Sequence, residues 1–183
     1  MRTFSWLAPM LLLAAMSAAR AEAPAEPPGY RLEDYRAPVP ATVAGGRAIG
    51  TVEAEALWRG HRALFVDVLP APRRPENLPA ETLWKPVPRR DIPESLWLPE
   101  VGRGALSAAF DAYFRDSLAR ASNGDKSAPI VFYCLADCWM SWNATKRAAA
   151  YGYTQLYWYR DGTTGWEAAK LPIAEATPAP GQP

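Results

Sequence analysis

The chain has 183 residues, with 20 Lys and Arg against 19 Asp and Glu, so its formal net charge is +1. This balance gives no reason to expect binding to nucleic acid or to a charged lipid surface. Two cysteines are too few for a disulfide scaffold, so a hydrophobic core must hold the fold. The single histidine, His61, lies in a polar link, which leaves too few partners for a Cys-His or Ser-His-Asp catalytic arrangement or for a zinc site.

Residues 1–21 have the composition of a secretory signal peptide. Arg2 and the free amine supply a positive start, residues 6–16 are apolar, and residues 19–21 fit the small-x-small cleavage rule. The apolar stretch is too short to span a bilayer, and no later segment is long or apolar enough to do so. We therefore expect cleavage after Ala21 and export to an oxidising compartment, the bacterial periplasm. Roughly 160 residues then remain, which suits one domain.

The first half of the mature chain contains one helix and one buried strand. Residues 22–48 are rich in Pro and Ala, contain two Tyr-Arg pairs, and are expected to be extended and to pack on the domain. Thr51 can cap a helix over 52–58. The near-continuous apolar run 63–69 predicts a strand buried on both faces. The proline-rich stretch 70–93 is either a functional or mobile cover or a rigid surface loop.

The second half alternates strands with helices. The pattern predicts strands over 95–99, 129–134 and 155–159. Helices are predicted between them over 106–118 and 141–151, and a short last helix is predicted from Trp166. Such alternation is typical of an α/β fold with a parallel central sheet flanked by helices. The domain is expected to span 49–170, and the tail 171–183 is expected to be disordered.

Both cysteines lie where the strand over 129–134 passes into the next helix. In parallel sheets, ligands bind beyond the carboxyl ends of the strands. Cys134 ends this strand, and Cys138 falls in the following loop or the first turn of the helix. The positive end of the helix and nearby backbone N–H groups would stabilise a thiolate there. If the loop is roughly helical, the two Cα atoms are about 6 Å apart, within disulfide reach.

Several segments together resemble the rhodanese-like domain. They are "ALFVDVL", "IPESLWLP", "PIVFYC" with the loop that follows it, and "KRAAAYGYTQLYWYRDGTTGW". The resemblance implies that Cys134 is the position of the nucleophile that carries a persulfide, that the backbone N–H groups of residues 135–139 surround it, and that Asp67 stabilises the fold. More narrowly, "DVLP", "SLWLPEVG" and "FYCLADCWMSWNATKRA" resemble the PQQ-dependent catabolism-associated proteins with a CXXCW motif, although three residues separate the cysteines here. That resemblance implies a role near PQQ-dependent alcohol oxidation, with a PQQ-dependent dehydrogenase or a cytochrome as partner.

The loop departs from the arginine-rich sequence of a rhodanese-like sulfurtransferase. Leu135 and Trp139 replace the two arginines, Asp137 lies near the expected glycine, and Ala136 and Met140 complete the loop region. Arginine is the usual partner of oxyanions, and losing two such contacts removes on the order of 3–6 kcal/mol of donor binding. Efficient use of thiosulfate, a dianion, is therefore not expected. Trp139 is expected to contact a ligand, because it takes the place of a substrate-facing arginine in the resembled motif.

Three interpretations of the cysteine pair remain open. Cys134 and Cys138 can cycle between dithiol and disulfide, in redox or sulfur-transfer chemistry with a small sulfur or thiol substrate. They can bind Cu(I), with Met140 as a third soft ligand. They can also form a static disulfide in a non-catalytic accessory module, although so small a ring gains little from chain entropy. No organic cofactor or resident metal is expected from the sequence.

Overall fold

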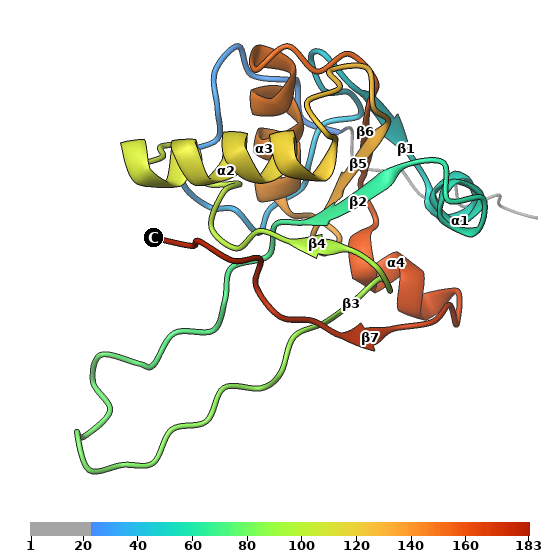
Figure 1. Cartoon of the computed structure of the whole chain (residues 1–183). Coiled ribbons are helices and arrows are strands. Elements are labelled where there is room, and N and C mark those ends of the chain that lie inside the picture. Colours follow the sequence, from blue (N-terminus) through green and yellow to red (C-terminus); the bar gives the residue numbers. More distant parts are fainter. Residues whose placement is uncertain (1–22) are drawn as a thin grey trace, which may run out of the picture.

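Five short parallel strands form the central sheet of the computed structural model, which describes residues 23–183 (Figure 1). The strands are β1 (Arg47–Ile49), β2 (Leu64–Asp67), β4 (Leu96–Trp97), β5 (Ile130–Tyr133) and β6 (Leu156–Tyr159). Their order across the sheet is β1-β6-β5-β2-β4. Every residue of β5 is buried, as expected for a strand covered on both faces. The predicted signal peptide lies outside the described residues.

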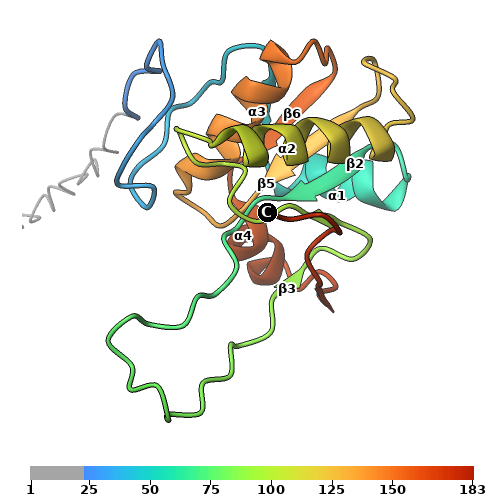
Figure 2. The same ribbon diagram turned by 60° about the vertical axis from the view of Figure 1, so that its left-hand side comes forward.

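Two helices cover each face of the sheet (Figures 1 and 2). They are α1 (Thr51–Arg59), α2 (Ala108–Ala121), α3 (Trp139–Ala150) and α4 (Gly162–Ala168). One apolar cluster joins residues of α2 and α3 to β2 and β5, and a second joins α1 and α4 to the opposite face. The predicted α/β architecture with a parallel sheet and flanking helices is therefore confirmed.

All four helix starts differ from the predictions: α2 begins two residues later and α3 two residues earlier, and the starts of α1 and α4 have identifiable causes. Gly50, not Thr51, is the N-cap of α1. The Thr51 hydroxyl instead lies 2.9 Å from the Tyr159 hydroxyl and 3.2 Å from a carboxylate oxygen of Asp161, so it joins α1 to the end of β6. The last helix starts four residues before Trp166, which is itself fully buried.

The two ends of the described chain are more ordered than the sequence suggests. β1 adds residues 47–49 to the edge of the sheet beside β6, although the prediction placed 47 and 48 in the extended N-terminal segment. The prediction of a disordered tail over 171–183 is wrong: β7 (Ala174–Glu175) pairs with β3 (Arg90–Asp91). The tail amide of Ala179 also donates to a carbonyl of β4, 2.9 Å away. Backbone hydrogen bonds hold the tail despite its low apolar content.

The proline-rich stretch projects from the body of the molecule as an arm, residues 70–89 (Figures 1 and 2). Its two ends are fixed by ion pairs, Arg73 with Glu100 at 3.4 Å and Arg89 with Asp67 at 2.7 Å. At its outer turn, the Arg74 guanidinium donates to the carbonyls of residues 78, 79 and 82. The arm extends away from α3 and β5, so it is an exposed surface loop and not a cover over the cysteines.

Candidate functional site: a buried disulfide at the sheet edge

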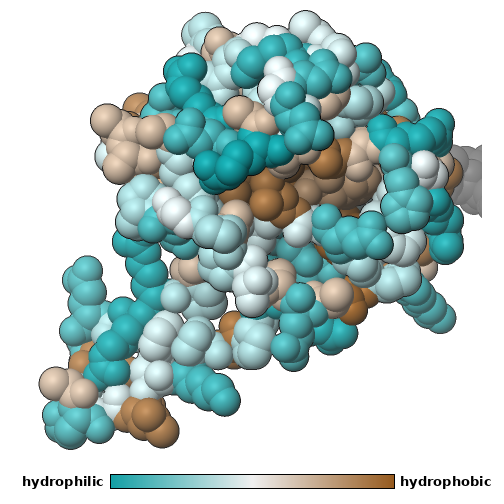
Figure 3. Space-filling view, viewed as in Figure 1, coloured by the Kyte–Doolittle hydropathy of each residue, from teal (hydrophilic) through white to brown (hydrophobic). Residues whose placement is uncertain are grey.

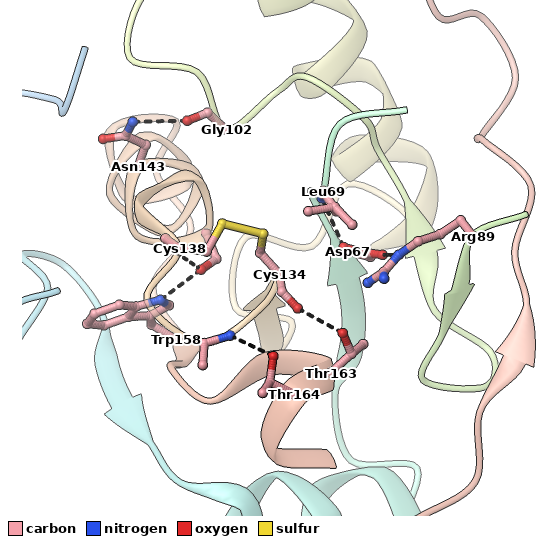
Figure 4. Close-up of a disulfide and its surroundings, with 12 residues drawn as sticks. Asp67, Leu69, Arg89, Gly102, Cys134, Cys138, Asn143, Trp158, Thr163 and Thr164 are labelled. Atoms are coloured by element: carbon pink, nitrogen blue, oxygen red, sulfur yellow. Dashed lines mark hydrogen bonds and ion pairs between the residues drawn. A yellow bond between two sulfur atoms is a disulfide. The ribbon is translucent and has the colours of Figure 1, made fainter. Parts of the chain in front are cut away.

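Cys134 and Cys138 form a disulfide at the carboxyl end of β5 (Figure 4). Cys134 directly follows the strand, and Cys138 is the N-cap of α3. Their Cα atoms are 6.2 Å apart, which agrees with the separation predicted for a roughly helical loop. The register Asp67↔Tyr133 brings the end of β2 to the same edge of the sheet. The disulfide therefore lies at the carboxyl ends of the strands, where parallel α/β sheets bind ligands.

Hydrogen bonds fix the backbone at both cysteines (Figure 4). The Cys134 carbonyl accepts from the Thr163 amide at 2.9 Å and from its hydroxyl at 3.4 Å. The Cys138 carbonyl accepts from the Ser141 hydroxyl at 3.1 Å, and that hydroxyl accepts from the Trp158 indole. The loop is thus held by α4 at Cys134 and by Ser141 of α3, itself bound by Trp158 of β6, at Cys138.

The sulfur atoms are closed off from solvent. Cys134 is 0% exposed and Cys138 is 3% exposed. Both belong to the apolar cluster between the sheet and the α2 and α3 helices, together with Val68, Leu98 and Met140. Because thiol–disulfide exchange needs direct attack on a sulfur atom, any reductant must first displace part of this cover.

The predicted loop residues differ in what they contact. Leu135 packs against the disulfide cluster, and the Ala136 amide donates to the Thr164 hydroxyl at 3.2 Å. Asp137 is exposed and has a φ of 51°, a left-handed conformation that Asp adopts more readily than most side chains. This conformation explains how Asp137 serves near the position where the resembled motif has a glycine.

Trp139 packs away from the disulfide, in a third apolar cluster. Its ring centroid lies 5.3 Å from that of Trp142, edge to face, and Val39 and Val43 complete the contact. Trp139 is 4% exposed, and its indole nitrogen has no hydrogen-bond partner among the described residues. In this structure the side chain supports the N-terminal segment and does not face an open ligand site.

Some of the backbone N–H groups that were expected to surround Cys134 already donate hydrogen bonds to other parts of the chain. The Trp139 amide, the first of α3, donates to the Tyr35 carbonyl at 2.9 Å, and Arg36 forms an antiparallel bridge with Cys138. The N-terminal segment therefore takes the hydrogen bond that a ligand at the start of the helix would otherwise receive. The Tyr-Arg pairs of this segment were visible in the sequence, but their place beside the cysteines was not.

A buried charged group lies at the same edge of the sheet, between β2 and β3. Asp67 is fully buried, accepts from the Leu69 amide at 2.9 Å and pairs with Arg89 (Figure 4). Burial raises the pKa of Asp67 to about 6, and Arg89 opposes this rise. Burial and the Asp67 charge together raise the pKa of Asp91 to about 7. One guanidinium therefore faces two carboxyl groups, and this pair takes up a proton at a pH closer to neutral than exposed carboxyl groups do.

Tyr133 closes this charged group from the β5 side. Its hydroxyl donates to the Ser95 hydroxyl at 2.7 Å and accepts from the Ile92 amide at 3.2 Å. Burial raises the pKa of Tyr133. The sequence analysis identified Asp67 as a fold-stabilising carboxylate, which its contacts support, but it missed Asp91 and Arg89.

Lys146 and Arg147 hold neighbouring segments on α3. The Lys146 ammonium donates to the carbonyls of Pro27, Pro28 and Gly29 at 2.8–3.2 Å. Arg147 is buried, and its guanidinium donates to three carbonyls of the loop between β4 and α2, at residues 101, 103 and 104. These are long-range main-chain contacts, for which the local sequence carries no signal.

Residues 23–183 contain few other candidate sites. No cluster of three or more His, Cys, Asp or Glu side chains there is arranged to hold a metal ion. None of the helices in this range has the length and apolar character needed to cross a bilayer. His61 is exposed, with Nδ1 3.4 Å from a Glu94 carboxylate oxygen, so it lies on the surface as predicted.

Several solved structures share features of this fold at low sequence identity. A polysulfide-sulfur transferase homodimer from Wolinella succinogenes is 18% identical, with a TM-score of 0.44, and the match covers 73% of this chain and 82% of that one. A human single-domain sulfurtransferase is 25% identical, with a TM-score of 0.41 and coverage of 67% and 96%. A thiosulfate sulfurtransferase from Pseudomonas aeruginosa is 16% identical, with a TM-score of 0.48 and coverage of 73% and 21%.

The family assignment rests on the sequence itself. No curated protein matches the chain at a significant level. Residues 53–169, well over half of the chain, match the family described as the rhodanese-like domain. This range contains most of α1, the other three helices, the disulfide and every strand of the five-stranded sheet except β1 at its edge. With its strand-end cysteine and parallel sheet, the chain belongs to the rhodanese-like domain family.

Proposed function

We propose that this chain is a periplasmic thiol protein in which Cys134 and Cys138 cycle between dithiol and disulfide during redox or sulfur-transfer chemistry. One observation carries the proposal: the disulfide joins the strand-end cysteine, the position that the resemblance gives to the nucleophile, to a second cysteine at the N-cap of α3. The second thiol is thereby placed to resolve any adduct that forms on the first. The disulfide is the resting, oxidised state of this cycle.

The chemical steps balance with a dithiol as the reductant. A protein dithiol reduces the disulfide and becomes a disulfide itself, leaving Cys134 and Cys138 as thiols. The Cys134 thiolate then attacks the outer sulfur of a persulfide, R–S–SH, giving a Cys134 persulfide and releasing R–S⁻. Cys138 attacks the Cys134 sulfur, restores the disulfide and expels HS⁻, and the Cys138 proton passes to solvent.

The charge around the loop favours a persulfide over thiosulfate as the sulfur donor. The loop itself has no arginine, and Asp137 is exposed at its outer side. Arg89, at the same end of the strands, is paired with Asp67 through Nε, and its buried Nη2 has no hydrogen-bond partner among the described residues. A dianionic donor would therefore meet a negative side chain without a free bidentate partner.

A second candidate function is a non-catalytic accessory module with a structural disulfide. The complete burial of Cys134 favours it, because a static disulfide needs no path for a reductant. The resemblance to PQQ-associated proteins suggests a PQQ-dependent dehydrogenase or a cytochrome as the partner of either form. The two candidates differ in the reduction potential that they require.

The deciding experiment is the reduction potential of the pair, measured by equilibrating the mature protein in glutathione or dithiothreitol buffers and trapping free thiols. A potential above about −220 mV supports the thiol function, and one below about −300 mV supports the structural candidate. Single-turnover transfer from a persulfide adds a second criterion. Cys134→Ser should abolish sulfur uptake, whereas Cys138→Ser should allow uptake and block the release of HS⁻.

A further inference from the structure

Residues 29–36, here called the strap, lie across the start of α3 beside the disulfide. The strap contains both Tyr-Arg pairs, Tyr30-Arg31 and Tyr35-Arg36. It accepts a hydrogen bond from the Trp139 amide at Tyr35 and forms an antiparallel bridge between Arg36 and Cys138. An extended stretch of main chain thus runs next to one of the two cysteines.

The surface under the strap binds main-chain atoms of the strap. The fully buried Asn143 accepts from the Arg31 amide at 2.9 Å and donates to the Arg31 carbonyl at 2.8 Å. Its other amide hydrogen is held by the Gly102 carbonyl at 2.9 Å, which fixes its orientation (Figure 4). Lys146 binds Gly29 and the two residues before it through carbonyl oxygens. Contacts of this kind do not depend on the side chains of the bound segment, and they are typical of peptide recognition.

The same surface has places for the strap's aromatic and basic side chains. The Arg147 guanidinium lies 4.2 Å from the centre of the Tyr30 ring, and the Arg31 guanidinium lies 5.3 Å from the Trp139 ring. The Tyr35 hydroxyl accepts from the Gly104 amide at 3.1 Å. The surface therefore contacts the side chains of Tyr30, Arg31 and Tyr35, whereas residues 32–34 and Arg36 are exposed.

We propose that α3 and the loop between β4 and α2 form a peptide-binding groove, which the strap occupies in cis. An extended segment of another protein, carrying a Tyr-Arg dipeptide and a second tyrosine five residues after the first, displaces the strap and opens the way to the disulfide. The groove would thereby restrict reduction of Cys134–Cys138 to proteins that carry this segment. The role of the disulfide rests on the function proposed above, whereas the groove rests on the strap contacts alone.

The first test measures how fast dithiothreitol reduces the disulfide in the mature chain. Tyr35→Ala removes the phenol contacts to the groove, so we expect the strap to open more often and reduction to be about tenfold faster. Glu33→Ala is the matched control within the strap, because the Glu33 side chain is exposed. Leu57→Ala is the control for global stability, because Leu57 packs on the opposite face of the sheet. Equal acceleration by Tyr35→Ala and Leu57→Ala would overturn the proposal.

The second test uses a fluorescent peptide with the sequence of residues 29–39. We expect saturable binding to the Tyr35→Ala chain and at least tenfold weaker binding to the unchanged chain, whose own strap competes. A peptide with both tyrosines replaced by alanine should not bind. Absence of saturable binding to the Tyr35→Ala chain contradicts the groove. A concentration-dependent dimer that exchanges straps would assign the groove to a second copy and overturn the partner assignment. Peptide binding together with a potential below about −300 mV would keep the groove and refute the thiol function.

Discussion

Asp91→Asn should make the protein more stable at alkaline pH, with an effect that disappears in acid. Asp91 is 3% exposed, and one of its carboxylate oxygens has no hydrogen-bond partner among the described residues. Burial and the charge of Asp67 raise the pKa of Asp91 from 3.8 to about 7. The folded state therefore holds this proton more tightly than the unfolded state does. The free energy of unfolding of the unchanged protein must fall as the pH rises from 4 through 7.

The magnitude follows from the size of the pKa change. A rise of about three units corresponds to about 4 kcal/mol, and relaxation around the buried group reduces this to between 2 and 4 kcal/mol. Asparagine has nearly the same shape and cannot ionise, so the variant should lose this part of the pH dependence. Urea unfolding at pH 4 and pH 8 measures both curves, with the exposed Asp116→Asn as the control. Parallel curves for the variant and the unchanged protein would mean that Arg89 fully compensates the Asp91 charge, and the reasoning would be refuted.

Three further substitutions test the surroundings of the disulfide. Replacing Cys134 and Cys138 together by serine should cost about 2 kcal/mol of unfolding free energy, because the ring is short; a loss above about 4 kcal/mol in urea would show a larger structural role. Arg147→Met should cost about 3 kcal/mol by leaving three carbonyl groups without their donor, and thermal unfolding should show recovery of part of this loss in Arg147→Lys. Gly162→Ala should cost about 2–4 kcal/mol, because φ is +52° and the new Cβ would lie 2.4 Å from the Cys134 carbonyl oxygen. Gly124→Ala, with φ of +77° and open space, is its control; equal thermal shifts would exclude the steric contribution.

The sequence predicted the centre of the sheet because its signals there are local. The runs that became β2, β5 and β6 are apolar enough to need cover on both faces, and helical spacing between them predicts the connecting helices. The place of Cys134 at a strand end and its distance to Cys138 follow from the same local pattern. Two-residue and three-residue strands such as β1, β3 and β7 are too short to show a period.

The packing of the N-terminal segment on α3, beside the disulfide, could not be read from the sequence. It depends on which distant main-chain atoms reach α3, and Asn143 and Arg147 have the same local pattern whether they are solvated or buried. Arg31, which is hydrogen-bonded to Asn143, lies 112 residues earlier in the chain. The sequence analysis therefore located the cysteines correctly but gave no sign that Arg147 is buried.

The arm, residues 70–89, separates two parts of the chain that alternate across the sheet. Leu83 and Val87 in it are 95% and 81% exposed, and Figure 3 shows apolar atoms at its outer part. A protease cut after Leu83 would leave β1 and β2 on one fragment and β4, β5 and β6 on the other. In the sheet order β1-β6-β5-β2-β4, the strands of the two fragments are interleaved. The two fragments would therefore stay associated until the protein is denatured. The arm is thus a suitable position at which to divide this protein into two complementing fragments.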